Sequence, residues 1–98
     1  MATTYPFSVP RLIDLCRQND VSQLGVFGSV ARGEGTAQSD LDLLVSFQSR
    51  KSLLEVVALE RQLSQAFGQK VDLLTEAAIS PYLRPAILSD LKVIYEAR

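Results

Sequence analysis

Carboxylates set into apolar, strand-like sequence are the feature that most restricts how this 98-residue chain can fold. A short apolar run ends at the Gly28-Ser29 pair, and ten residues later Asp40-Leu41-Asp42 opens a second apolar run. A third aspartate, Asp72, lies inside a later run, Lys70-Val71-Asp72-Leu73-Leu74. Burying a carboxylate is costly unless its charge is compensated. The fold must therefore bring these acids to a place where a compensating partner can bind.

The composition is that of one folded domain. Apolar residues are 47% of the chain and charged residues 21%, which are ordinary fractions for a folded soluble protein. The net charge of −1 offers no basic footprint for a long nucleic acid, although it leaves room for a local basic patch. We expect residues 1–98 to form a single domain, with residues 1–7 as a loose N-terminal leader.

The absence of histidine removes several kinds of active site. The chain has no histidine and one cysteine, Cys16, which excludes Ser-His and Cys-His catalysis, His-ligated zinc and an intramolecular disulfide. Cys16 lies in a helical pattern, which favours a buried apolar role over a nucleophilic one. Any metal must bind oxygen ligands, which indicate magnesium or manganese. We find neither a signal peptide nor a membrane span in the sequence, so we expect a cytoplasmic protein.

Hydrophobic periodicity and turn residues predict an alternation of helices and strands. Ser8 can cap the first helix, Ser52-Leu53-Leu54-Glu55 is a capping box that opens the longest helix, and Gly68 can end that helix. In chain order, we expect a helix from Ser8 to Asn19-Asp20, a strand over 24–27, a helical turn and loop over 29–39, a strand over 41–47, a helix over 52–67, a strand over 71–74, a helix opened by Pro81 near 82–88, and a strand over 91–95. This order is typical of an α/β domain.

The longest helix carries a broad apolar face that we expect to be buried. This face comprises Leu53, Val56, Val57, Leu59, Leu63, Ala66 and Phe67. The helix is long enough to cross over, so strands 41–47 and 71–74 can lie parallel. The three tyrosines, Tyr5, Tyr82 and Tyr95, are expected to be half-buried rather than to stack on a base.

Asp40 and Asp42 are expected on one face of the second strand. Side chains alternate along a strand, so both acids share a face with Leu44, and their Cα atoms lie about 6.6 Å apart. The register of the neighbouring strand decides whether Asp72 joins them. Clustered carboxylates repel one another unless a divalent cation binds, and two metal ions can clamp both oxygens of a displacement at phosphorus.

The Gly28-Ser29 pair suits the same chemistry. Gly28 has no side chain, so a phosphate can approach its backbone, and Ser29 offers a hydroxyl at the start of a helical turn. A triphosphate held there, with metal ions held by Asp40, Asp42 and Asp72, describes attack on an α-phosphate with loss of pyrophosphate.

The acids and the glycine also have plainer interpretations. Asp40 and Asp42 could be solvated acids at the start of a strand, Asp72 a lone surface acid, and Gly28-Ser29 an ordinary turn with a helix cap. The spacing between the Gly-Ser pair and the Asp pair favours metal ligands.

The neighbouring polar residues are less specific. Arg32 can contact phosphate, or it can pair with Glu34 or another acid. Lys70 is most simply a solvated charge at the end of a strand, and Ser39 is expected to cap or orient the loop before Asp40.

The motif resembles a known superfamily. Gly28-Ser29, ten intervening residues and Asp40-Leu41-Asp42 match the signature of the DNA polymerase β-like nucleotidyltransferases. The local form Gly28-Ser29-Val30-Ala31-Arg32-Gly33 and the short length are similar to the minimal nucleotidyltransferases of prokaryotes, including the MntA-type antitoxins that pair with HEPN-domain ribonuclease toxins. The likeness is close over 24–47 and good over 70–74.

This resemblance implies a fold, a reaction and a partner. It implies a mixed sheet of about four strands flanked by helices, Asp40 and Asp42 as ligands of two Mg²⁺ ions (or Mn²⁺), and Asp72 as a ligand of the catalytic ion that also activates the acceptor hydroxyl. It implies ATP as the donor and a tyrosine of a cognate HEPN-type toxin as the acceptor of AMP.

Two other functions stay open at this point. The chain could be a non-catalytic antitoxin that masks its partner by contact. It could also transfer a nucleotide to a small molecule or to an RNA end with an accessory subunit, although its size and net charge count against the RNA version.

Overall fold

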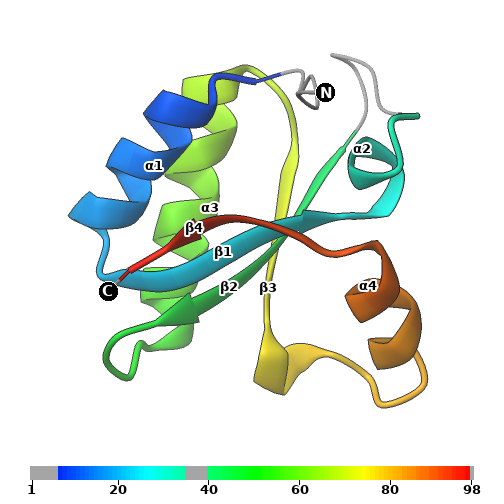
Figure 1. The fold of residues 1–98 in the computed structure, drawn as a ribbon. Helices are drawn as coiled ribbons and strands as arrows, with labels where there is room; N and C mark the ends of the chain where they lie inside the picture. Colours follow the sequence, from blue (N-terminus) through cyan, green and yellow to red (C-terminus); the bar gives the residue numbers. More distant parts are fainter. Residues whose placement is uncertain (1–6, 35–39, 98) are drawn as a thin grey trace.

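The computed structural model describes residues 7–34 and 40–97, and Figure 1 shows their arrangement. The elements in chain order are α1 (Val9–Gln18), β1 (Val21–Phe27), α2 (Gly28–Ala31), β2 (Leu41–Phe47), α3 (Leu53–Phe67), β3 (Val71–Thr75), the 3-10 helix η1 (Glu76–Ala78), α4 (Arg84–Asp90) and β4 (Lys92–Glu96). This order confirms the predicted alternation of helices and strands.

The strands form one mixed sheet in the order β3-β2-β1-β4. β1 is antiparallel to both β2 and β4, whereas β2 and β3 are parallel. Helix α3 makes the crossover between the two parallel strands, as its length predicts. Helices α1 and α3 lie on one side of the sheet and α4 lies on the other (Figure 1), while the short helix α2 follows β1 and contributes Val30 and Ala31 to the core beneath α1 and α3.

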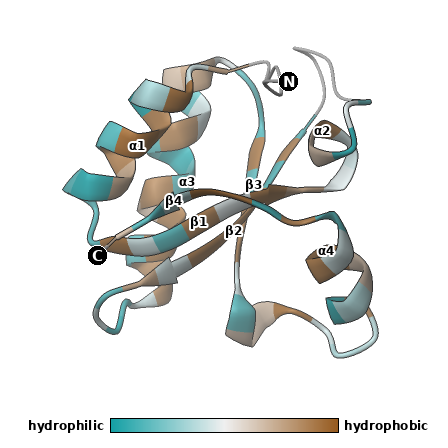
Figure 2. Cartoon of the chain, viewed as in Figure 1, coloured by the Kyte–Doolittle hydropathy of each residue, from teal (hydrophilic) through white to brown (hydrophobic). Residues whose placement is uncertain are grey.

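The main hydrophobic core lies between the sheet and helices α1 and α3. Alternation along β2 points Leu41, Leu43 and Val45 into this core, and each is at most 1% exposed. In Figure 2 the strands are largely brown, while α1 alternates brown and teal, as expected for a helix with one buried side. The buried, fully apolar setting of Cys16 raises the pKa of its thiol to about 12 and confirms its role as a small hydrophobic residue.

Local sequence signals set the ends of the two long helices. Ser8 accepts a hydrogen bond from the Arg11 backbone N–H at the start of α1, and Ser52 accepts one from the Glu55 backbone N–H at the start of α3. Gly68 ends α3 with a φ of 64°, a left-handed conformation that glycine adopts without strain. These helix ends match the sequence prediction.

Two element boundaries were predicted wrongly. β1 begins at Val21, three residues before the predicted start, because a register shift between Val21 and Gln23 interrupts the alternation that marks a strand. α4 begins at Arg84, not near Tyr82, because Pro85 has no backbone N–H to donate and fits only the first turn of a helix.

The predicted burial of several apolar residues was also wrong. In α3, Leu53 is 78% exposed and Val57 is 40% exposed, because this helix packs against the edge strand β3 and side chains that project beyond the edge stay in solvent. Tyr82 is 94% exposed in the turn before α4, whereas Tyr95 packs on the core as predicted.

The prediction of a loose leader over residues 1–7 was wrong at Phe7. Phe7 packs against Phe67, with the ring centroids 5.6 Å apart, so it belongs to the folded domain. Residues 1–6, including Tyr5, lie outside the described residues. Within 7–34 and 40–97, no helix has the length and apolar character needed to cross a bilayer.

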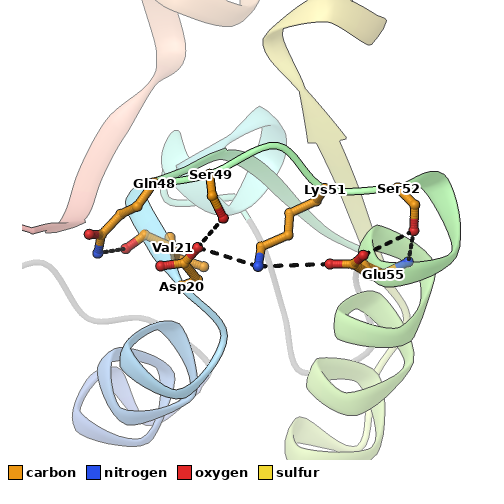
Figure 3. A network of polar contacts seen from close by, with 7 residues as sticks. All are labelled: Asp20, Val21, Gln48, Ser49, Lys51, Ser52 and Glu55. Carbon is orange, nitrogen blue, oxygen red and sulfur yellow. Dashed lines mark hydrogen bonds and ion pairs between the residues drawn. The ribbon is translucent and has the colours of Figure 1, made fainter.

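A polar network joins three segments at the end of the sheet where β2 finishes (Figure 3). Asp20, with a φ of 61°, accepts hydrogen bonds from the Ser49 hydroxyl and lies 3.3 Å from Lys51 Nζ. Lys51 also lies 3.7 Å from Glu55 Oε2 in the first turn of α3. The Ser49 hydrogen bond and the Lys51 charge lower the pKa of Asp20. The network therefore links the start of α3 to the C-terminal end of β2, whereas Asp42 lies near the N-terminal end of that strand.

Candidate active site

Asp42 and Asp72 lie opposite each other on neighbouring strands. The parallel register pairs Leu41 with Val71 and Asp42 with Asp72. The flanking residues Leu41 and Val71 are buried in the main core, so alternation directs both carboxylates to the other face of the sheet. The register that the sequence left open therefore places Asp72 on the same face of the sheet as Asp42.

The electrostatics of Asp42 reflect this crowding. Asp42 is half-buried, and burial is the main cause that raises the pKa of its carboxyl, followed by the negative charges of Asp72 and Asp40. A hydrogen bond with Asp72 acts in the same direction. Such a carboxylate is stabilised when a cation binds beside it.

Asp40 lies at the edge of this group rather than inside it. It is exposed, and its carboxylate lies 4.0 Å from Lys70 Nζ, beside the backbone hydrogen bond from Leu41 N–H to the Lys70 carbonyl. Among the described residues no three His, Cys, Asp or Glu side chains lie close enough together to hold a metal ion. The Lys70 side chain is 70% exposed immediately before β3, as predicted for a solvated charge at the end of a strand, and its contact with Asp40 is a surface pair.

The donor set nevertheless suits a hard divalent cation. The paired carboxylates of Asp42 and Asp72 place oxygen atoms on one face of the sheet, and Asp40 immediately precedes the strand that carries Asp42. Oxygen ligands are those that magnesium and manganese prefer.

Gly28 lies directly against the carboxylate of Asp42. Its φ is +75°, and a Cβ atom added to it would overlap Oδ2 of Asp42. Phe27, the residue before it, pairs with Asp42 in the antiparallel register of β1 and β2. A side chain at position 28 would therefore displace Asp42, which gives a physical reason for glycine at the start of α2.

Ser29 and Arg32 follow Gly28 in and just after α2. Ser29 is half-buried, one residue after the glycine that contacts Asp42. The Arg32 guanidinium lies 3.4 Å from Glu34 Oε1 through Nε and 2.6 Å from Asp90 Oδ2 through Nη1. Its positive charge also lowers the pKa of Asp42, so Arg32 lies near the acidic pair.

The contacts of Arg32 match its predicted alternative as an ion-pair partner of Glu34 or another acid. Asp90 is the residue that sequence analysis missed. It lies 58 positions from Arg32, and no local pattern marks it. Ser39, which was expected to orient the loop before Asp40, lies outside the described residues.

Residues 9–94 match the sequence pattern of the nucleotidyltransferase domain. The chain belongs to this family. The predicted resemblance, the predicted fold and the predicted class of enzyme are thereby confirmed. The roles of the individual site residues stay predictions.

Two curated relatives are similar over most of their length. A Methanocaldococcus jannaschii protein named "Putative protein adenylyltransferase MJ0435" is 39% identical over 80 residues, which cover 82% of this chain and 86% of that protein. Protein adenylyltransferase MntA of Thermococcus cleftensis is 37% identical over 71 residues, which cover 72% of each chain.

Solved structures agree with this assignment. A minimal nucleotidyltransferase structure is 37% identical with a TM-score of 0.73, and the match covers 86% of each chain. The structure of a toxin-antitoxin with AMP-PNP has a TM-score of 0.79 at 22% identity, over 93% of this chain and 75% of that one. The second likeness concerns the fold.

Proposed function

We propose that this chain transfers AMP from ATP to a hydroxyl group of a partner protein, in a reaction that depends on Mg²⁺ or Mn²⁺. The observation that carries the proposal is the pairing of Asp42 with Asp72 on the sheet face that also presents Gly28. Two carboxylates with little compensation beside a glycine-bearing turn suit a site for cations and phosphates.

The three aspartates would hold the metal ions. Asp40 and Asp42 would bind both ions, and Asp72 would bind the catalytic ion. Bound ions supply positive charge that neutralises the triphosphate and the charge that develops at phosphorus. The raised pKa of Asp42 fits this role, since the carboxylate gains most when a cation arrives.

The chain's own residues would guide the transfer. Asp72 would accept the proton of the acceptor hydroxyl, whose oxygen then forms a bond to the α-phosphorus. The bond from the α-phosphorus to the bridging oxygen breaks, and pyrophosphate leaves. Gly28 would let a phosphate approach the backbone, while Ser29 and Arg32 would contact the phosphate oxygens.

The acceptor we propose is a tyrosine of a cognate HEPN-type toxin, which would make this chain the antitoxin of a hetero-oligomeric pair. Support comes from the MntA relative named a protein adenylyltransferase and from a neighbour in the fold, a complex of a tri-AMPylated Shewanella oneidensis HEPN toxin with its MNT antitoxin. We place the reaction in the cytoplasm, where ATP is supplied.

Transfer of a label from ATP to the partner tests this proposal. Wild-type chain, labelled ATP, Mg²⁺ and the cognate toxin should yield labelled toxin. The double variant Asp40→Asn with Asp42→Asn should leave the toxin unlabelled. Asp14→Asn, an exposed acid on α1, is the matched control and should label the toxin as the wild type does. Equal labelling by the double variant would exclude the proposed reaction.

Exposed apolar side chains support a second candidate function, in which the chain masks its partner by contact alone. Leu53, Leu54 and Tyr82 are at least 78% exposed, and such side chains are common in protein-protein contacts. If masking is sufficient, the same double Asp variant will still bind the toxin and rescue growth. If transfer is required, the variant will bind the toxin without rescuing growth.

A further inference from the structure

We infer that Asp90, at the end of α4, is a positioning residue that holds the Arg32 guanidinium beside the phosphate site. The inference rests on the proposed function, because it concerns how tightly the chain binds a nucleoside triphosphate. Asp90 acts through Arg32, and nothing places it in contact with the reacting atoms.

The contacts of Arg32 fix the guanidinium from two sides. Nε faces Glu34 at 3.4 Å, and Nη1 faces Asp90 at 2.6 Å. The second contact is short enough for a strong charge-assisted hydrogen bond, and only 27% of the Asp90 side chain is exposed, against 63% for Glu34. Asp90 is therefore the stronger of the two anchors.

The position of Asp90 is itself fixed by packing on the sheet face that carries Asp42 and Asp72, here called the catalytic face. Ile87 and Leu91 pack against the small apolar cluster of Phe27, Leu44 and Ile79. Phe27 pairs with Asp42 across the sheet, so α4 rests on the strands that carry the acid.

A glycine in β1 makes this packing close. A Cβ atom on Gly25 would come within 2.6 Å of Cδ1 of Leu91, so the missing side chain lets Leu91 approach the strand. Asp90 immediately precedes Leu91, so the packing of Leu91 on β1 fixes the position of Asp90 relative to Arg32.

The stability of α4 does not explain an acid at position 90. Asp90 is the last residue of this helix, where the partial negative charge of the helix end disfavours a carboxylate. The ion pair with Arg32 compensates that disadvantage. Replacing Asp90 with asparagine should therefore leave the stability of the fold almost unchanged.

Holding Arg32 in place before the nucleotide arrives should favour binding. An arginine side chain has many rotamers, and a ligand that has to order it binds more weakly than one that meets an ordered guanidinium. Freeing one such side chain corresponds to about a tenfold loss of affinity.

Calorimetric binding of the non-hydrolysable analogue AMP-PNP with Mg²⁺ tests the inference on the full chain. We expect Asp90→Asn to weaken binding about tenfold, Asp90→Glu to restore part of the loss, and the melting temperature to stay the same in both. In an Arg32→Gln background, Asp90→Asn should have no further effect, because the two residues act as one unit. Nitrogen relaxation of Arg32 Nε should show a more mobile side chain in Asp90→Asn.

Different outcomes separate this inference from the proposed function. Three outcomes would overturn the positioning role and leave the proposed function intact. They are unchanged or tighter binding of AMP-PNP by Asp90→Asn, an additive loss of affinity in the Arg32→Gln background, and an Arg32 side chain that is as rigid in Asp90→Asn as in the wild type. A wild-type chain that does not bind AMP-PNP would overturn the proposed function and this inference with it.

Discussion

The two faces of the sheet are covered to different extents. On one face, α1 and α3 close over a continuous cluster of buried apolar residues that includes Leu24, Leu43 and Leu63. On the other face, the buried apolar cluster consists of Phe27, Leu44 and Ile79, and no residue of α4 is fully buried. The acids Asp42 and Asp72 lie on this second, thinly covered face.

The difference in apolar burial suggests that the two faces have different roles: one mainly stabilises the fold, and the other carries the acids of the proposed site. Burial of apolar surface is the main favourable contribution to folding, so the α1/α3 face, with the larger buried cluster, should contribute more to stability than the other face. The other face holds the like charges of Asp42 and Asp72 close together, an arrangement that costs stability and suits the cation site that we propose. Four predictions follow the contrast between the faces, from the largest expected effect to the smallest.

Removing an acid from the catalytic face should separate activity from stability most strongly. We expect Asp72→Asn to lower AMP transfer by about a thousandfold, equivalent to about 4 kcal/mol, because the change removes the side chain that we propose as metal ligand and proton acceptor. The free energy of unfolding should stay equal or rise, since a repulsive charge beside Asp42 is gone. Label transfer and urea unfolding measure the two quantities. A variant that keeps its activity, or that loses clear stability, would contradict the contrast.

Truncating one leucine on each face should show which face stabilises the fold. Leu43→Ala, at a side chain with 0% exposure in the main core, should cost about 3 kcal/mol of unfolding free energy. Leu74→Ala, at a half-buried side chain beside the small cluster, should cost about 1–2 kcal/mol. Urea unfolding compares the two directly, and equal losses would show that both faces contribute alike.

Gly28→Ala should lower activity for a steric reason that a second glycine can isolate. Both Gly28 and Gly33 have a positive φ, so each alanine variant should lose about 1 kcal/mol of stability through backbone strain. Only at Gly28 would the added Cβ overlap the Asp42 carboxylate, whereas at Gly33 no atom of the described residues (7–34 and 40–97) lies within 4 Å. AMP transfer should therefore fall about tenfold or more in Gly28→Ala alone. Equal activity of the two variants would remove the proposed link between Gly28 and Asp42.

The smallest expected effect is a pH dependence of the metal-free protein. Burial and the charges of Asp72 and Asp40 raise the pKa of Asp42 above its ordinary value of 3.8. Between that value and the raised one, the folded protein keeps a proton that the unfolded chain releases. The free energy of unfolding should then fall as pH rises through this window and stay lower above it.

Urea unfolding without divalent ions, from about pH 3 to pH 7, measures this dependence against Asp42→Asn. The stability of the wild type relative to the variant should decline with rising pH. A relative stability that stays constant or increases would mean that Asp42 is not strained by its neighbours.

Much of the fold was predictable because its signals are local. The caps at Ser8 and Ser52, the glycine after α3 and the alternation along β2 each act within a few residues, so the sequence alone determined these elements. The Gly28-Ser29 pair and the spaced acids likewise indicated a phosphate and metal site before any contact was known. The starts of β1 and α4 were predicted wrongly, because a register shift interrupts the alternation of β1 and because Pro85 restricts where α4 can begin.

Only the tertiary structure decided which distant residues meet. Three features depend on how separate segments pack. They are the parallel register that places Asp72 opposite Asp42, the ion pair of Arg32 with Asp90, and the exposure of Leu53 at the sheet edge. Packing of this kind is a property of the whole chain, because each contact joins segments whose local patterns are independent of each other. The sequence thus specified the chemical groups and the elements that carry them, and the packing of the sheet determined which of those groups can act together.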